Sequence, residues 1–298
     1  MQHRQSLLSP ARSPRGSRTA VGAGVLTACV ATLLSAGALH PTPAAAAPAA
    51  TRPDAATADF LARVKPQGEE RVSAAVLDLD GTGREATVYG DDTPYDTASI
   101  VKVDILATAL LQGQDAKRGL TEKERSEAEV MIERSDNDAA NRLWRSIGRA
   151  GGLDAANKRL GLSETKGGPD AKWGLTRTTA RDQIRLLRAV YDTGTAARAA
   201  ATPLEEASRS YIRTLMSHVV DEQSWGVSAA AGSEWALKNG WLQRNTTELW
   251  DVNSVGRITA GGHHYLVAVL SDGSKSMKDG VALVERAVRA AVSSTAAH

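Results

Sequence analysis

Cysteine is nearly absent from this sequence, and so are the histidine patterns that bind metals. Cys29 is the only cysteine among 298 residues, and it lies in an N-terminal stretch that we expect to be cleaved off. The mature chain would then contain neither a disulfide nor a thiol nucleophile. None of the six histidines forms a His-x-His or His-Glu-x-x-His pattern, and His263 and His264 stand in a glycine-flanked turn. The sequence therefore predicts no metal and no other cofactor.

A strong charge of either sign is also missing. Lysine and arginine number 36 against 34 aspartates and glutamates, which leaves a net charge of +2. Such a balance predicts no basic surface of the kind that binds nucleic acid. We expect no nucleic-acid partner, and we expect a monomer.

No apolar run in the N-terminal region has the length and flanks of a membrane-spanning helix. Residues 1–20 hold four arginines and no acid, residues 21–39 are mostly apolar, and Ala44–Ala47 offer small residues to a signal peptidase. This three-part pattern predicts a signal peptide over residues 1–47 and a secreted or extracytoplasmic protein. A second interpretation is lipid anchoring at Cys29, because Leu26–Cys29 resembles a lipobox. Against it, the apolar run continues past the cysteine.

The remaining chain is organised as one domain. Residues 48–56, rich in alanine and proline, predict a disordered lead-in, and residues 57–298 are long enough for one large core. Hydrophobic periodicity predicts helices over residues 57–64, 99–112, 121–134, 138–147, 153–160, 179–190, 204–219 and 277–292, and strands over residues 72–79, 86–89, 235–242, 249–259 and 265–270.

This order of elements predicts an α/β fold of the α+β type. Strands from both ends of the domain can form one five-stranded antiparallel sheet, with the terminal helices on one face and the helical block on the other. Local signals support the element ends. Thr121-x-x-Glu124 and Thr179-x-x-Asp182 are capping boxes, which makes Asp182 a helix-capping residue, and Asp80–Gly83 is a hairpin turn.

The clearest chemical signal is Ser99-x-x-Lys102, at the start of a predicted buried helix. Residues three apart share a helix face, so the Ser99 hydroxyl and the Lys102 amine can come together. A serine hydroxyl needs a neighbouring base, and Lys102 can serve only if burial or other cations keep part of it neutral. The apolar run from Val103 to Leu111 supplies a dry setting. Ser99 near a helix N-terminus would lie in a positive potential that suits an oxyanion.

A second Ser-x-x-Lys occurs at Ser163–Lys166, although a chain of this composition carries about one by chance. It follows the helix stop at Gly161 and runs into Gly167-Gly168-Pro169, so it is typical of a polar loop. We assign the chemistry to Ser99 and Lys102.

Two further motifs follow in order, Ser135-Asp136-Asn137 and Lys238-Asn239-Gly240. With them the chain resembles the serine β-lactamase and penicillin-binding protein superfamily, and most closely the class A β-lactamase-like serine hydrolases. Ser-x-x-Lys and Ser-Asp-Asn match in full, while Lys-Asn-Gly replaces the usual Lys-Thr-Gly or Lys-Ser-Gly. The resemblance extends from about residue 57 to the C-terminal helix, and it implies the same architecture that the periodicity predicts.

The resemblance implies a catalytic set and a substrate-binding set, which are Ser99, Lys102, Ser135 and Lys238, and Asn137, Asn239, Gly240 and Trp241. Ser99 would be acylated, with its own N–H and that of Trp241 donating to the oxyanion. Ser135 would relay a proton to the leaving nitrogen, and Asn137 would bind the substrate's amide. Lys238 would attract a substrate carboxylate and lower the proton affinity of its neighbours.

Two departures from the family pattern matter. The segment from Lys102 to Ser135 is short, which predicts a more open cleft. The loop of residues 166–174 lacks the glutamate that activates the deacylating water in class A enzymes. Asp170 is the only acid in that loop, and it is a candidate deacylation base, with a loop-turn role after Pro169 as the alternative. Acylation is therefore better supported than turnover.

Three functional classes remain open. The first is a secreted serine hydrolase of the class A β-lactamase type, slow in deacylation and acting on β-lactams or related amides. The second is a peptidoglycan DD-peptidase or transpeptidase, which uses the same motifs without the glutamate. The third is a non-catalytic penicillin-binding cell-wall protein. In each case the expected partner is a small-molecule or peptidoglycan-derived acyl compound.

Overall fold

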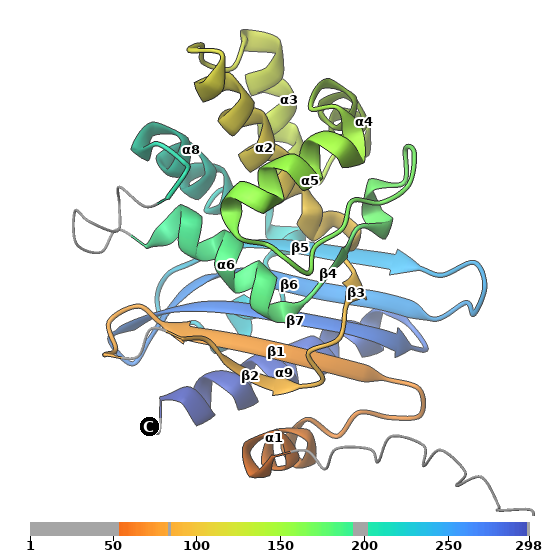
Figure 1. The fold of residues 1–298 in the computed structure, drawn as a ribbon. Helices are drawn as coiled ribbons and strands as arrows, with labels where there is room; N and C mark the ends of the chain where they lie inside the picture. Colours follow the sequence, from red (N-terminus) through yellow and green to blue (C-terminus); the bar gives the residue numbers. More distant parts are fainter. Residues whose placement is uncertain (1–53, 83–84, 193–201, 297–298) are drawn as a thin grey trace, which may run out of the picture. The chain divides into compact units, whose positions relative to one another are not determined.

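Five antiparallel strands form the centre of the fold (Figure 1). They are β1 (Arg71–Asp78), β2 (Thr87–Gly90), β5 (Trp235–Gln243), β6 (Trp250–Ala260) and β7 (His263–Ser274), in the order β2-β1-β7-β6-β5. The first and last thirds of the domain thus pair directly, through β1 and β7. This confirms the predicted five-stranded antiparallel sheet. It also makes β5, which carries the Lys-Asn-Gly motif, an edge strand.

The computed structural model describes residues 54–82, 85–192 and 202–296. The expected signal peptide, with Cys29, lies outside the described residues, as do residues 48–53 of the expected lead-in. Helix α1 (Ala55–Val64) begins two residues before its predicted start, because the Asp54 carboxylate accepts a hydrogen bond from the Thr57 N–H at 2.7 Å and caps it. Within the described residues, no helix is both long and apolar enough to cross a membrane.

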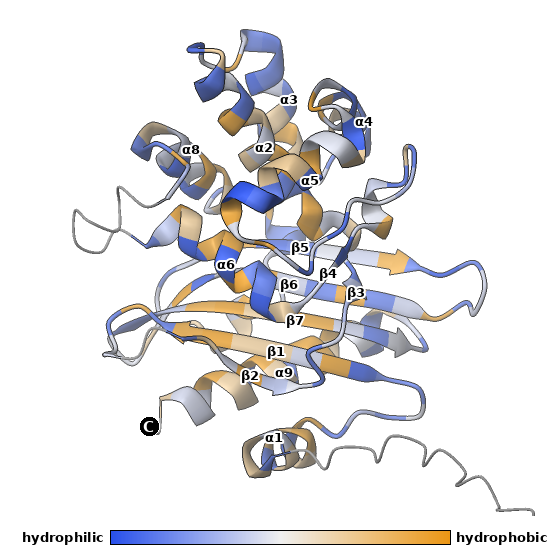
Figure 2. Cartoon of the chain, in the orientation of Figure 1, coloured by the Kyte–Doolittle hydropathy of each residue, from blue (hydrophilic) through white to orange (hydrophobic). Residues whose placement is uncertain are grey.

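One face of the sheet is covered by the two terminal helices. α9 (Met277–Thr295) packs on β7, β1 and β6, and α1 packs on α9 and β2. The core here is apolar, with Phe60, Tyr89 and Leu283 among its buried residues, and Figure 2 colours much of β1 and β7, on which α9 packs, as hydrophobic.

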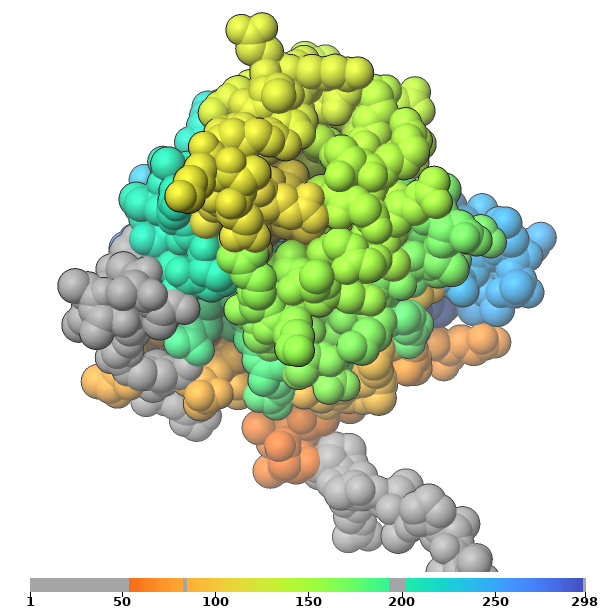
Figure 3. Space-filling view, turned by 45° about the horizontal axis from the view of Figure 1, so that its top comes forward, coloured from red at the N-terminus to blue at the C-terminus, as the bar shows by residue number. Residues whose placement is uncertain are grey.

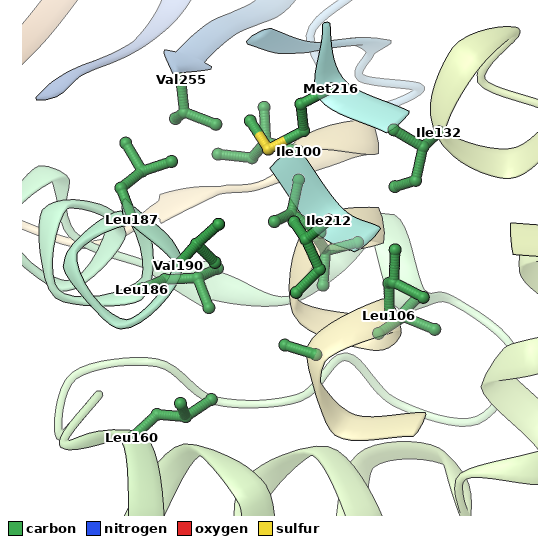
Figure 4. Close-up of a cluster of buried hydrophobic side chains, with 14 of the residues drawn as sticks. Ile100, Leu106, Ile132, Leu160, Leu186, Leu187, Val190, Ile212, Met216 and Val255 are labelled. Carbon is green, nitrogen blue, oxygen red and sulfur yellow. The ribbon is translucent and has the colours of Figure 1, made fainter. Parts of the chain in front are cut away.

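The helical block covers the other face of the sheet (Figures 1 and 3). Its helices are α2 (Val101–Asp115), α3 (Glu122–Glu133), α4 (Asn137–Ser146), α5 (Arg149–Leu160), α6 (Ala180–Tyr191) and α8 (Glu206–Met216). α2 lies at the centre of the block and contacts α3, α4, α5 and α8, while α6 rests on β7 and β1. Figure 4 shows the apolar core between block and sheet, where Leu106 of α2, Leu187 of α6 and Val255 of β6 are buried.

Local sequence signals correspond to observed element ends. Thr121 and Glu124 form the reciprocal capping box. At the second predicted box the Thr179 hydroxyl accepts from the Asp182 N–H, but the Asp182 carboxylate accepts from the Glu164 N–H and the Thr165 hydroxyl instead of closing the box. β6 and β7 are joined through Gly261 and Gly262, both with positive φ, +58° and +86°, as a tight hairpin turn requires. The periodicity missed the small pair β3 (Tyr95–Asp96) and β4 (Arg177–Thr178), because two residues are too short to show a period.

Candidate active site

Residues of the first two motifs, and Trp241 directly after the third, line one cleft of about 630 Å³. Ser99 lies on a 3₁₀ turn (Ala98–Ile100) before α2, Ser135 lies between α3 and α4, and Lys238 lies on β5. Ser99, Asn137 and Trp241 line the cleft itself. Ala98 and Asn141 line it too, and the other lining residues come from the 166–176 loop, from the end of β5 and from the connection between β5 and β6. A larger hollow, of about 840 Å³, shares no lining residue with this cleft.

The turn that carries Ser99 is strained and is held from the sheet. Ala98 has a φ of +45°, which is rare for a residue with a side chain. Asn253 of β6 donates its Nδ2 to the carbonyl oxygens of Asp96, at 2.9 Å, and Thr97, at 3.1 Å. Because this amide is fully buried, it fixes the backbone just before the nucleophile.

Gly240 lets β5 approach the Ser99 backbone closely. A Cβ at this position would lie 2.6 Å from the Ser99 nitrogen and 2.8 Å from the Thr97 carbonyl oxygen. Any side chain at residue 240 would therefore push the edge strand away from the nucleophile. The contact brings the backbone that leads into Trp241 beside Ser99.

Lys102 is fully buried and donates to three acceptors. Its Nζ lies 2.7 Å from the Ser135 carbonyl oxygen, 3.1 Å from Ser135 Oγ and 2.8 Å from Asn137 Oδ1. Three acceptors match the three N–H groups of an ammonium, so the resting geometry is that of the charged form.

We expected Ser99 and Lys102 to meet directly. Among the described residues, however, no hydrogen bond joins them, because Ser99 lies on the 3₁₀ turn and Lys102 reaches toward Ser135 instead.

The electrostatics of the site are set by burial. Burial lowers the pKa of Lys102 to about 7, against a smaller upward effect of the Asp136 carboxylate. Lys238 is fully buried, and burial first and the Lys102 charge second hold its pKa well below the ordinary lysine value. Part of the Lys102 population is therefore neutral at neutral pH.

The Ser135 hydroxyl joins the two lysines. It accepts from Lys102 Nζ at 3.1 Å and from Lys238 Nζ at 3.0 Å. A hydroxyl has two acceptor lone pairs and one proton, so with both lone pairs used its proton points elsewhere. Ser135 also has a positive φ of +56°, a conformation that turns it out of the helical path between α3 and α4. This arrangement can carry a proton from either lysine to a group in the cleft.

The structure does not bring Asn239 into the cleft, contrary to our expectation that it binds substrate. Its Nδ2 donates to the carbonyl oxygens of Gln223, at 2.8 Å, and Trp225, at 2.9 Å, and the side chain is fully buried. Successive side chains of a strand point to opposite faces, so Lys238 and Gly240 face the site while Asn239 faces away. Asn239 instead ties the 223–225 segment to the edge strand.

Asp170, the candidate deacylation base, also lies away from the cleft lining. Its side chain is exposed, its φ is +51°, and its carbonyl oxygen accepts from the buried Trp144 Nε1 at 2.8 Å. The geometry therefore corresponds to the alternative, a loop-turn residue. Glu164 is likewise an exposed residue outside the lining.

Trp173 was not anticipated from the sequence. Its ring centre lies 4.8 Å from Lys102 Nζ, and its Nε1 donates to Asn141 Oδ1 at 2.8 Å. Asn141 comes four residues after Asn137 on α4, so helical spacing alone could have placed both asparagines on the cleft side. Among the residues that line the cleft in the described chain, none is an aspartate or a glutamate.

Cations line the cleft instead. Lys172 and Arg244 both border it, and Arg244 forms an ion pair with the buried Asp96. Away from the cleft, Asp78, Asp80 and His263 place possible metal ligands within 4.8 Å of one another, at the exposed hairpin ends. We expected no metal, and this group shares no residue with the cleft lining.

Comparison with known proteins shows the family to which the chain belongs. Residues 125–295, more than half of the 298-residue chain, match the model of the β-lactamase enzyme family, so the chain belongs to that family. The matched region begins after Ser99 and Lys102, and the assignment of these two residues therefore depends on the geometry above.

Individual relatives are known from mycobacteria. The chain is 31% identical over 145 residues to the putative lipoprotein LppW of Mycobacterium tuberculosis and of Mycobacterium bovis. That alignment covers 47% of this chain and 45% of the relative, so the chain matches less than half of the relatives' length.

Solved structures show the same fold at low identity. PBP-A superposes with a TM-score of 0.67 at 19% identity, covering 82% of this chain and 96% of PBP-A. A variant of PBP-A was solved as an acyl-enzyme complex with penicillin G. A class A β-lactamase from Bacteroides cellulosilyticus superposes with a TM-score of 0.66 at 14% identity, covering 82% of this chain and 98% of that one.

Proposed function

We propose that this chain is an extracytoplasmic serine hydrolase of the class A β-lactamase type, in which Ser99 forms a slowly hydrolysed acyl-enzyme with β-lactams or related amides. The observation that carries the proposal is that Ser135 bonds both Lys102 and Lys238, while Lys102 also bonds Asn137, which lines the same cleft as Ser99. A serine three residues before a lysine of pKa about 7 supports this proposal, because acyl transfer at neutral pH requires a hydroxyl nucleophile and a base that is partly neutral.

In the proposed acylation, Ser99 Oγ attacks the carbonyl carbon while neutral Lys102 accepts the serine proton. Loss of one of the three protons from the Lys102 ammonium frees a lone pair for this task. The tetrahedral oxyanion accepts hydrogen bonds from the backbone N–H groups of Ser99 and Trp241, each worth about a hundredfold or more in rate. The close approach that Gly240 permits supports this pairing of donors.

Collapse of the tetrahedral intermediate breaks the carbon–nitrogen bond, and the leaving nitrogen takes a proton from Ser135. Ser135 regains a proton from Lys102, which carries the one removed from Ser99. Lys238 is fully buried behind Ser135, so its role here is electrostatic, favouring proton transfer away from its neighbours. Arg244 and Lys172 are the cleft-lining cations that a carboxylate on the substrate can meet directly.

Two features support slow deacylation. The described cleft lining contains no carboxylate that could activate water, and Asp170 lies outside it. Trp173 covers Lys102 from the side of the 166–176 loop, where its ring keeps water away from the lysine. Because a positioned base contributes about a hundred- to ten-thousandfold to such a step, we expect adduct lifetimes of hours.

A DD-peptidase or transpeptidase activity is the second candidate, and one observation favours it. β5 is the edge strand of the sheet and passes beside Ser99, so its unpaired backbone groups can pair with an extended peptide.

The third candidate, a penicillin-binding protein without turnover, differs only in the fate of the adduct. An extracytoplasmic location follows from the export pattern of the sequence and is consistent with lipoprotein-like relatives.

The test is covalent labelling by fluorescent penicillin, with the mass of the intact protein measured afterwards. We expect one adduct on the parent chain and none on Ser99→Ala. Ser163→Ala is the matched control, because Ser163 also begins a Ser-x-x-Lys sequence but lies on an exposed turn. An adduct on Ser99→Ala would refute the nucleophile, and no adduct on the parent would refute the proposed chemistry.

Hydrolysis of a chromogenic cephalosporin and release of D-alanine from a peptide then separate the first two candidates. A labelled protein that does neither belongs to the third class.

A further inference from the structure

A second pocket, of about 410 Å³, adjoins the cleft on the side of the β5–β6 connection. Arg244 and Thr246 line both hollows, so the two are neighbours across this connection. The second pocket, which we term the side pocket, is rich in charged residues from distant parts of the chain, namely Glu69, Arg71, Asp96, Arg177, Arg244, Asp251 and Asp272.

The arginines of the side pocket already have carboxylate partners. Arg177 and Arg244 both pair with Asp96, the former at 3.2 Å, and the Arg71 Nε donates to Asp272 Oδ1 at 3.0 Å. Asp96 is buried between its two arginines. Each arginine of the pocket thus has a carboxylate within ion-pair distance, with Arg177 and Arg244 sharing one, and the four acids of the lining outnumber its three arginines by one.

Asp251 has no such partner. Its side chain is 5% exposed, and within the described residues it forms no hydrogen bond and no ion pair. Asp251 lies two residues before Asn253 on β6, so both side chains project from the same face of the strand, toward Asp96 and the pocket. Burial, reinforced by the charge of Asp96, raises the pKa of Asp251 to about 7. A buried carboxylate without a partner costs stability, and such groups call for a functional reason.

We propose that the side pocket is a subsite for a primary ammonium group, carried by the ligand that occupies the cleft and paired there with Asp251. The inference rests on the proposed function, because it treats cleft and side pocket as one extended binding site. Glu69 lines the same pocket and forms no ion pair with any described residue, so two carboxylates face one incoming cation. A divalent metal would require about six oxygen ligands, more than these two side chains provide, whereas an ammonium requires only a few acceptors.

The ligand class follows from this chemistry. An acyl donor that acylates Ser99 and also reaches the side pocket must carry an amine-bearing side chain near the scissile bond. A peptide with a lysine-like residue next to its C-terminal dipeptide meets both conditions, and a small uncharged amide does not.

The test separates binding from catalysis by using Ser99→Ala, which cannot be acylated. Two probes are compared by isothermal titration calorimetry: Nα-acetyl-lysyl-D-alanyl-D-alanine, with a free side-chain amine, and the same peptide with that amine acetylated. We expect the free amine to bind at least about tenfold more tightly, and Asp251→Asn in the same background to remove that preference. Asp170→Asn is the matched control, because this carboxylate is exposed and lies outside both pockets.

A stability measurement guards against a purely structural explanation. The folded pKa of Asp251 lies above its unfolded value, so ionisation costs stability as the pH rises from about 4 to above 7. Asp251→Asn should therefore be as stable as the parent or more stable at pH 8. A residue retained only for folding would lose stability on this change.

Equal binding of the two peptides, binding of neither, or a preference that survives Asp251→Asn would each overturn the subsite. The proposed acylation of Ser99 is judged separately by penicillin labelling of the parent chain. Labelling without an amine preference would overturn this inference alone. An amine preference without labelling would overturn the proposed chemistry alone.

Discussion

The two faces of the sheet bury different kinds of side chain. The face under α1 and α9 packs apolar residues such as Phe60 and Leu283, and Phe60 stacks on Tyr89 with ring centres 5.4 Å apart. The face toward the helical block also buries ionisable groups, among them Lys102, Asp104, Lys238 and Asp251. Both faces belong to one sheet, so the contrast arises from what packs on each.

The terminal-helix face contributes mainly to stability, and the block face carries the groups proposed for chemistry. Apolar burial stabilises the fold by about 25 cal/mol per Å² of buried area, whereas a buried charge costs free energy unless it is paired. Burial raises the pKa of Asp104 to about 7 and lowers that of Lys102 to a similar value. The block side therefore contains groups that can change charge near neutral pH. Burying these groups costs folding free energy, which the apolar burial on the terminal-helix side offsets.

The largest expected effect concerns Lys102 on the block side. Lys102→Arg should reduce the rate of acylation by about a hundred- to ten-thousandfold, nearly as much as Lys102→Ala, because arginine keeps the charge but cannot lose a proton. The measurement is the rate of penicillin labelling, with circular dichroism to confirm that the variant is folded. Rapid labelling of the arginine variant would show that Lys102 supplies only charge and that another group takes the serine proton.

Phe60→Ala provides the opposite case on the terminal-helix side. Removing the chain's only phenylalanine, which is fully buried, should lower the free energy of unfolding by about 3–5 kcal/mol. Denaturant titration measures the loss, and the labelling rate of the folded fraction should stay within about twofold of the parent. If that rate fell with stability, the two faces would not be independent and the comparison would fail.

The smallest expected effect concerns Trp173, at the border of the block and the cleft. Acylation in the parent should rise with pH through about 7, because Lys102 acts as a base only above its pKa. Trp173→Ala should admit water, moving that midpoint up by about one pH unit, since rehydration outweighs the lost cation–π attraction of about 0.5–2 kcal/mol. It should also shorten the adduct lifetime about tenfold.

The Trp173 experiment has a matched control. Trp173→Phe keeps a ring over Lys102 but loses the hydrogen bond to Asn141, so its pH midpoint should remain near that of the parent. The measurements are labelling rates between pH 5.5 and 9 and adduct decay followed by mass spectrometry. An alanine variant with an unchanged midpoint and lifetime would mean that Trp173 neither dries Lys102 nor shields the ester.

Much of the fold could be predicted from the sequence because its signals are local. Periodicity placed the helices and the five strands of the main sheet, and the capping box at Thr121 and the glycines of the β6–β7 turn marked element ends. The three motifs could be recognised because each spans only three or four residues. The family assignment follows from those motifs together with the order of the elements.

The sequence by itself therefore determined the sheet, the two helical layers and the identity of the motif residues. Only the tertiary structure decided how those residues meet: Lys102 bonds Ser135 and Asn137 rather than Ser99, and Asn239 turns away from the cleft. It also placed Trp173 over Lys102, from a loop some 70 residues further along the chain, and left the Asp251 side chain buried without a partner among the described residues. The physical reason is that periodicity and capping depend on neighbours within a few residues, whereas hydrogen bonds, burial and pKa values in the site depend on side chains that only the packing of sheet and block brings together.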